Sequence, residues 1–467
     1  MGGRHVAGDP MNDWHEAEQQ VERAHELYEA GRWDEAEAAL RQALSVNPYQ
    51  AEWQFNLGLT LEAAGRLEDA VKAFKQSYEL AEDGDAQSAM ILGSTLIELN
   101  RPAEAVRWLE RALEHAPDSV DAHVHLIDAM SLLERHDEAE VHFYLAIQIN
   151  PHSGPAHAAL AESLLDRREY DRAVWCLREA AKYDNSLPRI HARLARAYAE
   201  TGRLERARQL YLREIRRNPG DVETIVDLGR LLMDMNRTVE ADEKLRRALE
   251  IEPDHTEAHM SLGELADSCD DHERARRHFD VVVRLDPAYG GARRKLASVL
   301  LAKHRQSEQK RIADLLKDET NDVKRDGTAF TNDDLDELLG LLLDAGMPAE
   351  AEAIARKLID RKPGDAAAHH HLSMAQFGLG RVAQGVVSAR RALRLKPDFV
   401  APMHNLAVAH LRRGEISRAR YWVQQGLAIE PEDRGLRRLR TYLRVHAIRS
   451  LGQHIALMFR RSRNSGQ

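Results

Sequence analysis

The 467-residue chain has few cysteines, few aromatic residues and no long apolar run. Its two cysteines, Cys176 and Cys269, have no second cysteine at the short spacing of metal or redox sites, so a disulfide framework is not indicated. The longest apolar stretch, Leu338 to Leu343, is interrupted by Gly340 and is far shorter than the ~18 residues of a membrane span. We therefore expect a soluble protein in a reducing compartment and predict a cytoplasmic location.

Motifs that carry catalysis are also missing from the sequence. It has no HExxH, no phosphate-binding P-loop and no GxSxG. The stretch Gly378 to Ala383 reads GLGRVA and matches a dinucleotide-binding pattern by letter, but no predicted strand precedes it, as that pattern requires. We predict that the protein is not an enzyme and that it uses no cofactor and no metal.

The net charge of −10 hides an asymmetry along the chain. Residues 434–467 contain nine arginines and no acidic residue, so the rest of the chain is more acidic than the total suggests. An acidic body is a poor nonspecific binder of nucleic acid, because each phosphate contact must be supplied by a cation. We predict no nucleic-acid partner.

A 34-residue period runs through most of the chain. In the unit that begins at Val120, small residues occupy positions 20 and 27, Ala139 and Ala146, and Phe143 lies between them at position 24. Each unit closes on a helix-breaking residue, usually proline, as the following series shows: Pro117, Pro151, Asn185, Pro219, Pro253 and Pro287, then Pro363, Pro397 and Pro431. A fixed period of this length predicts helix pairs that stack on one another.

This pattern resembles the tetratricopeptide repeat. The resemblance implies an all-α fold, a right-handed α-α superhelix of about twelve units in which first helices line a concave groove. It also implies a protein-binding scaffold. We predict a disordered tail over 1–13, repeats 1 to 9 over 14–321, a polar insert or hinge over 322–331, repeats 10 to 12 over 332–431, and a basic amphipathic capping helix with a tail over 432–467.

The C-terminal segment has the spacing of an amphipathic helix. Its apolar residues recur at steps of three and four: Leu436, Leu439, Leu443, Ala447, Leu451, Ile455 and Met458. One interpretation is that this helix caps repeat 12, because an uncapped solenoid exposes its core. The other is that its arginines contact an anionic membrane or an acidic partner. The sequence leaves both open.

The resemblance implies that positions 2, 5, 6, 9, 12 and 13 of each first helix form the groove. In repeat 6 these positions include Arg189, Arg193 and Arg196, spaced to lie on one helical face. Arginine pairs bidentately with carboxylates, so we predict that they bind an acidic peptide segment. The alternative is that carboxylates of neighbouring repeats satisfy them as salt bridges, namely Glu162, Glu223 and Asp227.

Four further groove residues are candidates for partner binding: Phe55, Asn56, His371 and Asn405. Some tetratricopeptide proteins bind acidic chaperone C-termini with Lys and Asn, but Phe55 and Leu59 occupy positions 5 and 9 of repeat 2, so chaperone docking is not predicted. His371 follows two other histidines, which suggests a metal site. However, one framework column holds histidine in five repeats, and we interpret it as packing: His123, His157, His191, His259 and His369.

The predicted function is a protein-interaction scaffold or adaptor that binds an extended peptide or a partner helix in its groove. Two alternatives remain at this stage. The protein could be a peripheral membrane assembly factor that uses its Arg-rich C-terminal helix, or a regulatory or substrate-recruiting subunit of a separately encoded enzyme such as a glycosyltransferase. The sequence leaves the partner and the oligomeric state open.

Overall fold

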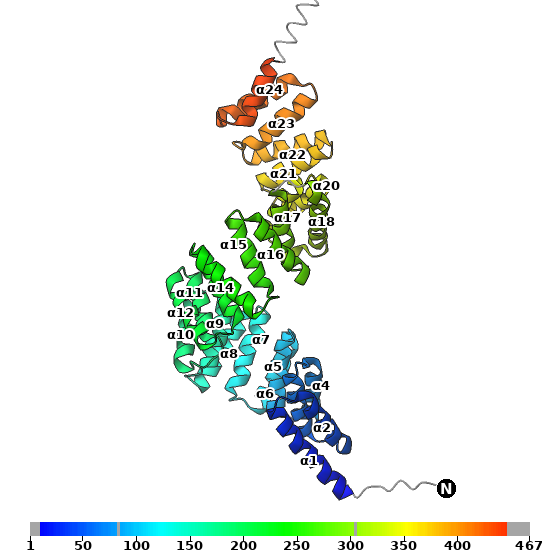
Figure 1. Cartoon of the computed structure of the whole chain (residues 1–467), viewed down its shortest axis with the longest axis vertical. Helices are drawn as coiled ribbons and strands as arrows, with labels where there is room; N and C mark the ends of the chain where they lie inside the picture. The colour runs from blue at the N-terminus through cyan, green and yellow to red at the C-terminus, as the bar shows by residue number, and fades with distance from the viewer. Residues whose placement is uncertain (1–9, 82–84, 303–305, 446–467) are drawn as a thin grey trace, which may run out of the picture. The chain divides into compact units, whose positions relative to one another are not determined.

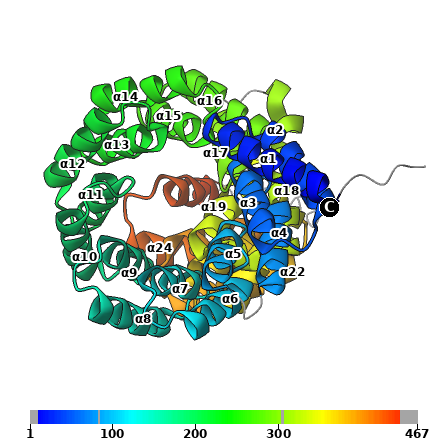
Figure 2. The same ribbon diagram turned by 90° about the horizontal axis from the view of Figure 1, so that it is seen from below.

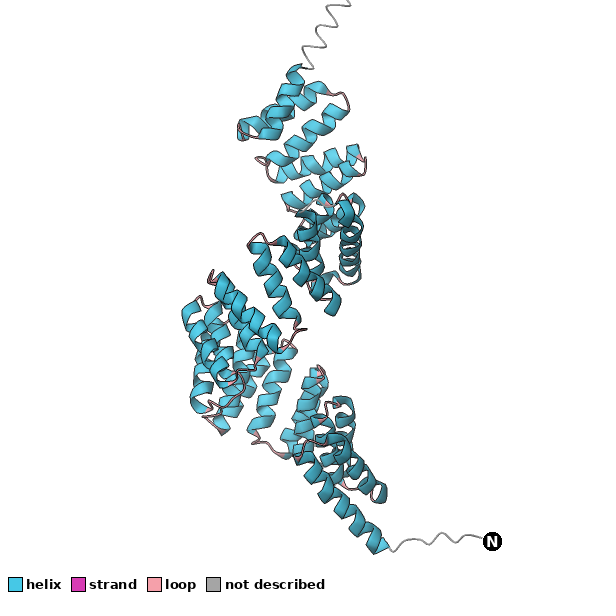
Figure 3. Cartoon of the chain, in the orientation of Figure 1, coloured by secondary structure: helices cyan, strands magenta, loops and turns pink. Residues whose placement is uncertain are grey.

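The computed structural model describes residues 10–81, 85–302 and 306–445 (Figure 1). Within these ranges the chain forms α-helices and two short 3-10 helices, and no β-strand (Figure 3). The helices α1 to α24 follow one another as consecutive pairs, and most pairs coincide with a predicted 34-residue unit. The all-α repeat fold predicted from the period is confirmed.

The chain divides into two compact units, residues 1–244 and 245–467, which we describe separately. The helices of the first unit are α1 (Pro10–Glu29), α2 (Trp33–Val46), α3 (Ala51–Ala63), α4 (Leu67–Leu80), α5 (Ala86–Glu98), α6 (Pro102–His115), α7 (Val120–Leu132), α8 (His136–Ile149), α9 (Gly154–Asp166), α10 (Tyr170–Tyr183), α11 (Ile190–Glu200), α12 (Leu204–Arg217) and α13 (Val222–Asp234). The division between the units falls inside α14 (Thr238–Ile251).

The second unit has one irregular stretch, which comprises repeats 9 and 10 of the chain. Its elements are α15 (Thr256–Ser268), α16 (His272–Leu285), α17 (Ala292–Ala302), η1 (Gln306–Glu308), α18 (Gln309–Arg325), η2 (Gly327–Ala329), α19 (Asn332–Asp344), α20 (Pro348–Arg361), α21 (Ala366–Gly378), α22 (Val382–Leu395), α23 (Val400–Arg412) and α24 (Ile416–Ile429).

Repeat 4 shows how the sequence builds one pair. The Ser119 hydroxyl accepts a hydrogen bond from the Ala122 amide and so caps the start of α7. On α8 the framework residues Ala139 and Ala146 are fully buried and Phe143 is 3% exposed. Small side chains at these positions let the two helices approach closely, and the aromatic ring fills the remaining space.

The turn between the two helices of a pair needs a left-handed residue at position 15. Glycine supplies it in repeats 1, 2, 6, 10, 11 and 12, where all six glycines have φ between 71° and 75°. Other repeats accept residues with side chains at the same position, and their φ values lie between 56° and 60°: Asn100, Glu134, Arg168, Asn236 and Asp270. Each non-glycine turn costs roughly 1 kcal/mol, which the packing of the pair offsets.

Two predicted boundaries need correction. Helix α1 begins at Pro10, so residues 10–13 are helical rather than disordered, and residues 1–9 lie outside the described ranges. The predicted polar insert over 322–331 begins inside a helix, because α18 continues to Arg325 and Val323 is fully buried. The segment between helices is therefore 326–331, and its role as a hinge stays a prediction.

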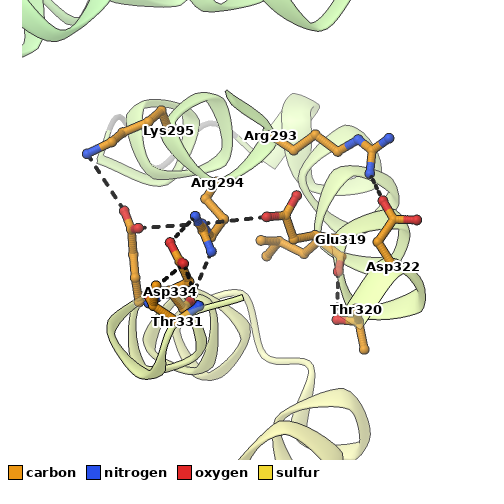
Figure 4. A network of polar contacts seen from close by, with 10 residues as sticks. Arg293, Arg294, Lys295, Glu319, Thr320, Asp322, Thr331 and Asp334 are labelled. Atoms are coloured by element: carbon orange, nitrogen blue, oxygen red, sulfur yellow. Dashed lines mark hydrogen bonds and ion pairs between the residues drawn. The ribbon is translucent and has the colours of Figure 1, made fainter. Parts of the chain in front are cut away.

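A buried ion network joins the helices on either side of this irregular stretch (Figure 4). Arg294 of α17 is 5% exposed, and its guanidinium donates to the carboxylate of Asp334 at 2.6 Å and to the Asp334 carbonyl at 3.1 Å. It also lies 3.5 Å from Glu319 of α18 and 3.5 Å from Glu337 of α19. Arg294 stands at position 5 of the degenerate repeat 9, where most repeats have an uncharged residue, and it links three helices by ion pairs.

The C-terminal capping helix is present in the described part of the chain. Residues 434–445 are helical, and Leu436 and Leu443 are buried in one cluster with Val400, Ala419 and Val423. Burying these leucines covers the apolar face that repeat 12 would otherwise expose. The remaining predicted apolar positions, from Ala447 to Met458, lie outside the described residues.

Gly58 provides a test of the close helix approach. A Cβ atom at this position would overlap the Phe74 ring, which is fully buried. We expect Gly58→Ala to lower the free energy of unfolding by about 1–3 kcal/mol, measured by urea denaturation. Gly340 is the control, because a Cβ there meets no atom within 4 Å, and Gly340→Ala should be neutral or stabilising. Equal destabilisation of both variants would contradict the packing role of Gly58.

Candidate functional site

A cavity of about 600 Å³ lies among the first helices of repeats 5, 6 and 7 in the first unit. Figure 2 shows α9 and α11 on the inner side of α10 and α12. The residues that line the cavity come from α9, α11, α13 and the turn before α11: Glu162, Pro188, Arg189, Ala192, Arg193, Arg196 and Asp227. The structure therefore brings the three predicted arginines to one concave site.

The start of α11 differs from that of the neighbouring first helices. The closing residue of repeat 5 is Asn185 rather than proline, and the Asp184 carboxylate accepts hydrogen bonds from the Ser186 amide and hydroxyl. The helix begins only at Ile190, and Arg189 precedes it with a left-handed φ of 54°. Arg189 was predicted on the helical face with the other two arginines, but it reaches the cavity from the turn.

Two of the three arginines already hold carboxylates. Arg193 donates from Nε to Glu162 at 2.7 Å. Arg189 lies 3.3 Å from Asp221 and 3.5 Å from Asp227. The acidic partners predicted from repeat 7 were Glu223 and Asp227. Asp227 does pair with Arg189, but the second carboxylate near Arg189 belongs to Asp221 rather than to Glu223. The salt-bridge alternative therefore applies to Arg189 and Arg193.

Arg196 is different from the other two arginines. Its side chain is exposed, and it forms no ion pair with any residue in the described part of the chain. Arg189 and Arg193 keep side-chain exposures of 41% and 35% despite their ion pairs. The cavity therefore presents one uncommitted guanidinium and two that an incoming carboxylate could reach.

Two residues of the site were missed by the sequence analysis. Asp221 is the N-cap of α13, where its carboxylate accepts hydrogen bonds from the Thr224 amide and hydroxyl. Aspartate is a preferred N-cap residue, so its place directly before the apolar run of α13 is a signal that could have identified it. Asp128 on α7 lies close enough to Glu162 and Arg193 to interact electrostatically with both. Burial raises the pKa of Asp128 to about 6; Glu162 raises it further and Arg193 opposes the shift.

Phe55 and Asn56 lie in repeat 2, whereas the arginine cavity is formed by repeats 5 to 7. The half-buried Phe55 ring packs against Phe74 with 5.6 Å between centroids. Asn56 lines a separate cavity of about 170 Å³ whose walls include Val21, Tyr28 and Leu59. Phe55 is thus part of the helix packing, and Asn56 faces a mainly apolar pocket.

His371 and Asn405 belong to the second unit. Asn405 lines a cavity of about 250 Å³ with Met374, His404 and Val408. His371 is half-buried, and its ring lies 5.6 Å from that of His370. Burial lowers the pKa of His370 to about 4 and also lowers the pKa of His371. These histidines are therefore neutral at physiological pH.

The described residues include no group of three or more His, Cys, Asp or Glu side chains that could hold a metal ion. The histidine column at position 4 has structural contacts instead. His259 and His369 each contact the carbonyl of the proline that closes the preceding repeat, at 3.0 Å and 3.2 Å. In the same part of the chain, no helix has the length and apolar character needed to cross a membrane.

Comparison with known families agrees with this architecture. Three family models, each described as tetratricopeptide repeat, match the chain at residues 21–85, 158–222 and 226–290, at residues 61–130 and 96–143, and at residues 400–425. Stacked helix pairs of this kind define the α-solenoid class. The chain belongs to the tetratricopeptide-repeat family.

Individual relatives are distant. Anaphase-promoting complex subunit 3 of Schizosaccharomyces pombe is 23% identical over 250 residues, covering 54% of this chain and 37% of that protein. The human protein O-mannosyl-transferase TMTC2 is 23% identical over 213 residues, covering 45% of this chain and 26% of that protein. The chain thus spans well under half the length of these relatives. One chain of a solved APC/C hetero-tetramer, Cut9–Hcn1, is similar in structure. The match covers 93% of this chain and 98% of that chain, at 14% sequence identity and a TM-score of 0.39.

Asp128 gives a pH-dependent prediction. Because its folded-state pKa of about 6 is above that of an unfolded aspartate, its protonated form favours folding, and this contribution is lost as the pH rises through about 6. Asp128→Asn should therefore raise the free energy of unfolding by about 1–2 kcal/mol above pH 6.5 and change it little near pH 4. Urea denaturation at both pH values measures this difference. A gain that does not depend on pH would contradict the assignment.

Proposed function

We propose that the protein is an interaction scaffold whose first unit binds an acidic peptide segment in the arginine cavity. The observation that supports this most directly is Arg196, an exposed guanidinium that lines the cavity and has no ion pair within the described residues. The tetratricopeptide fold serves protein interaction in general, and the inner face lets side chains vary without disturbing the framework.

Binding proceeds by exchange of ion pairs in this proposal. A ligand carboxylate first pairs with Arg196 and then competes with Glu162 for Arg193, whose current bond is 2.7 Å long. An exposed ion pair contributes little, about 0.2–1 kcal/mol, but a hydrogen bond to a charged group in a shielded cavity contributes about 1.5–3 kcal/mol. The affinity of the arginines for a ligand carboxylate therefore depends on how well the cavity walls shield these contacts from water.

The two other functions stay proposals with less support. For membrane binding, Leu436 and Leu443 are buried against repeat 12 and are not available for lipid, which leaves Tyr442 and Val445 as the exposed large apolar side chains in the described part of the C-terminal helix. For a subunit role, one relative is named as a subunit of the anaphase-promoting complex and another as a mannosyl-transferase, but this chain covers only 37% and 26% of them. Neither observation points to a particular partner.

Arg196→Glu is the sharpest variant for the groove proposal, because Arg196 is exposed and its replacement breaks no ion pair of the described residues. The probe is a fluorescein-labelled peptide of seven glutamates, followed by fluorescence anisotropy. We expect Arg196→Glu to weaken binding by about tenfold, since a charge-assisted hydrogen bond is lost and a repulsion is added. Circular dichroism should show unchanged helicity.

The matched control is Arg216→Glu, an exposed arginine on α12 that does not line the cavity. It changes the net charge of the protein equally. If both variants weaken the peptide to the same extent, the attraction is a general charge effect. If neither variant changes the affinity, the arginine cavity is not the binding site.

A further inference from the structure

A second cavity lies in the second unit. It measures about 450 Å³ and is formed by α14, α15 and α16. Its polar walls consist of three arginines, two histidines and one glutamate: Arg246, Arg274, Arg277, His259, His278 and Glu250. Arg246 and Glu250 come from the second helix of repeat 7, and the three α16 residues come from the second helix of repeat 8, so this cleft lies outside the inner groove. We name it the outer cleft.

The two histidines of the outer cleft are joined to each other. Their Nδ1 atoms are 3.0 Å apart and the ring centroids are 5.3 Å apart. His259 is 3.0 Å from the Pro253 carbonyl through Nε2, and a carbonyl can only accept, so this nitrogen carries a proton. The imidazole pair is therefore held by hydrogen bonds on both sides, and it forms a fixed part of the wall.

Repeat 4 contains the same histidine pair with the opposite surrounding charge. His123 and His142 occupy the same framework positions, with Nδ1 atoms 3.1 Å apart and centroids 5.3 Å apart. The residues that correspond to Arg246, Arg274 and Arg277 are Glu110, Glu138 and Val141. The fold accepts glutamate and valine at these positions around an unchanged histidine pair. The three arginines are therefore not a requirement of packing.

The charge balance of the outer cleft favours an anion. Glu250 is the one acidic residue in its wall, and Arg247 neutralises it through an ion pair of 2.7 Å. Arg246 and Arg274 have contacts of their own, so an incoming anion must share these two guanidinium groups with their present partners. Three of the polar residues in the wall are therefore arginines, and the single carboxylate of the wall already has a cationic partner.

We infer that the outer cleft binds a phosphomonoester dianion through Arg246, Arg274 and Arg277. A guanidinium presents a planar fork of donors that matches phosphate oxygens, and three such groups suit a dianion with several acceptors better than a single carboxylate. Leu249 and Val281 also line the cleft and provide apolar surface beside the charges. This surface suits a phosphorylated side chain with apolar neighbours, and inorganic phosphate is the simplest ligand of the same chemistry.

Isothermal titration calorimetry tests the inference with two probes. The first is a pentapeptide with a central phosphoserine between leucines, with its unphosphorylated form as a blank, and the second is inorganic phosphate. We expect the phosphopeptide to bind with one site per chain and the blank not to bind. Inorganic phosphate that competes with equal affinity would identify phosphate alone as the ligand. Absence of binding by both probes would overturn the inference.

The loss-of-binding variant is Arg274→Glu/Arg277→Val, which introduces the residues that repeat 4 already has at these positions. The fold should tolerate it, and the affinity for the phosphopeptide should fall more than tenfold. Its control is Arg390→Glu/Arg391→Val, an equal charge change at two exposed residues of α22. Unchanged affinity in the first variant, or an equal loss in the control, would overturn the inference.

The reverse exchange tests whether the arginines are sufficient. In repeat 4 the variant Glu110→Arg/Glu138→Arg/Val141→Arg places the charges of the outer cleft around the second histidine pair. We expect the number of phosphopeptide sites per chain to rise from one to two. A folded variant that keeps one site would contradict the idea that charge at these framework positions defines the site.

Discussion

The close approach of paired helices at small residues is the constraint on which the rest of this structure depends. Ala139 and Ala146 are fully buried, and Gly58 leaves just enough space for the Phe74 ring. One helix pair has too little apolar surface to be stable alone, so each pair must bury its face against the next pair. Framework positions are therefore restricted to small or apolar residues. Positions that face away from the neighbouring pairs, on either the first or the second helix, can vary.

The candidate binding residues of the protein lie at these variable positions. The inner cavity of repeats 5 to 7 holds three arginines, Arg193 and Arg196 on α11 and Arg189 in the turn before it, and two of them already pair with carboxylates. The outer cleft of the second unit uses second-helix positions, and repeat 4 carries glutamates where this cleft carries arginines. The same backbone thus supports surfaces of opposite charge, because these side chains contribute little to the packing between helices.

The irregular repeats depend on polar contacts where apolar packing is incomplete. The first helix of repeat 6 begins two residues later than those of its neighbours, and Arg189 joins this repeat to repeat 7 through Asp221 and Asp227. In the ninth repeat, Arg294 links α17 to α18 and α19 from a position that is 5% exposed. A buried guanidinium is tolerated there because several carboxylate and carbonyl oxygens surround it, as Figure 4 shows.

The sequence by itself determined the helix pairs and their 34-residue period, and it gave the covering of repeat 12 by the C-terminal helix as one of two interpretations, which the burial of Leu436 and Leu443 supports. It also placed Arg189, Arg193 and Arg196 at groove positions. Only the tertiary structure decided that Asp221 rather than Glu223 meets Arg189, that Arg196 has no ion-pair partner in the described chain, and that the outer cleft exists. The period sets backbone positions, whereas ion pairs depend on the directions of long side chains from different repeats.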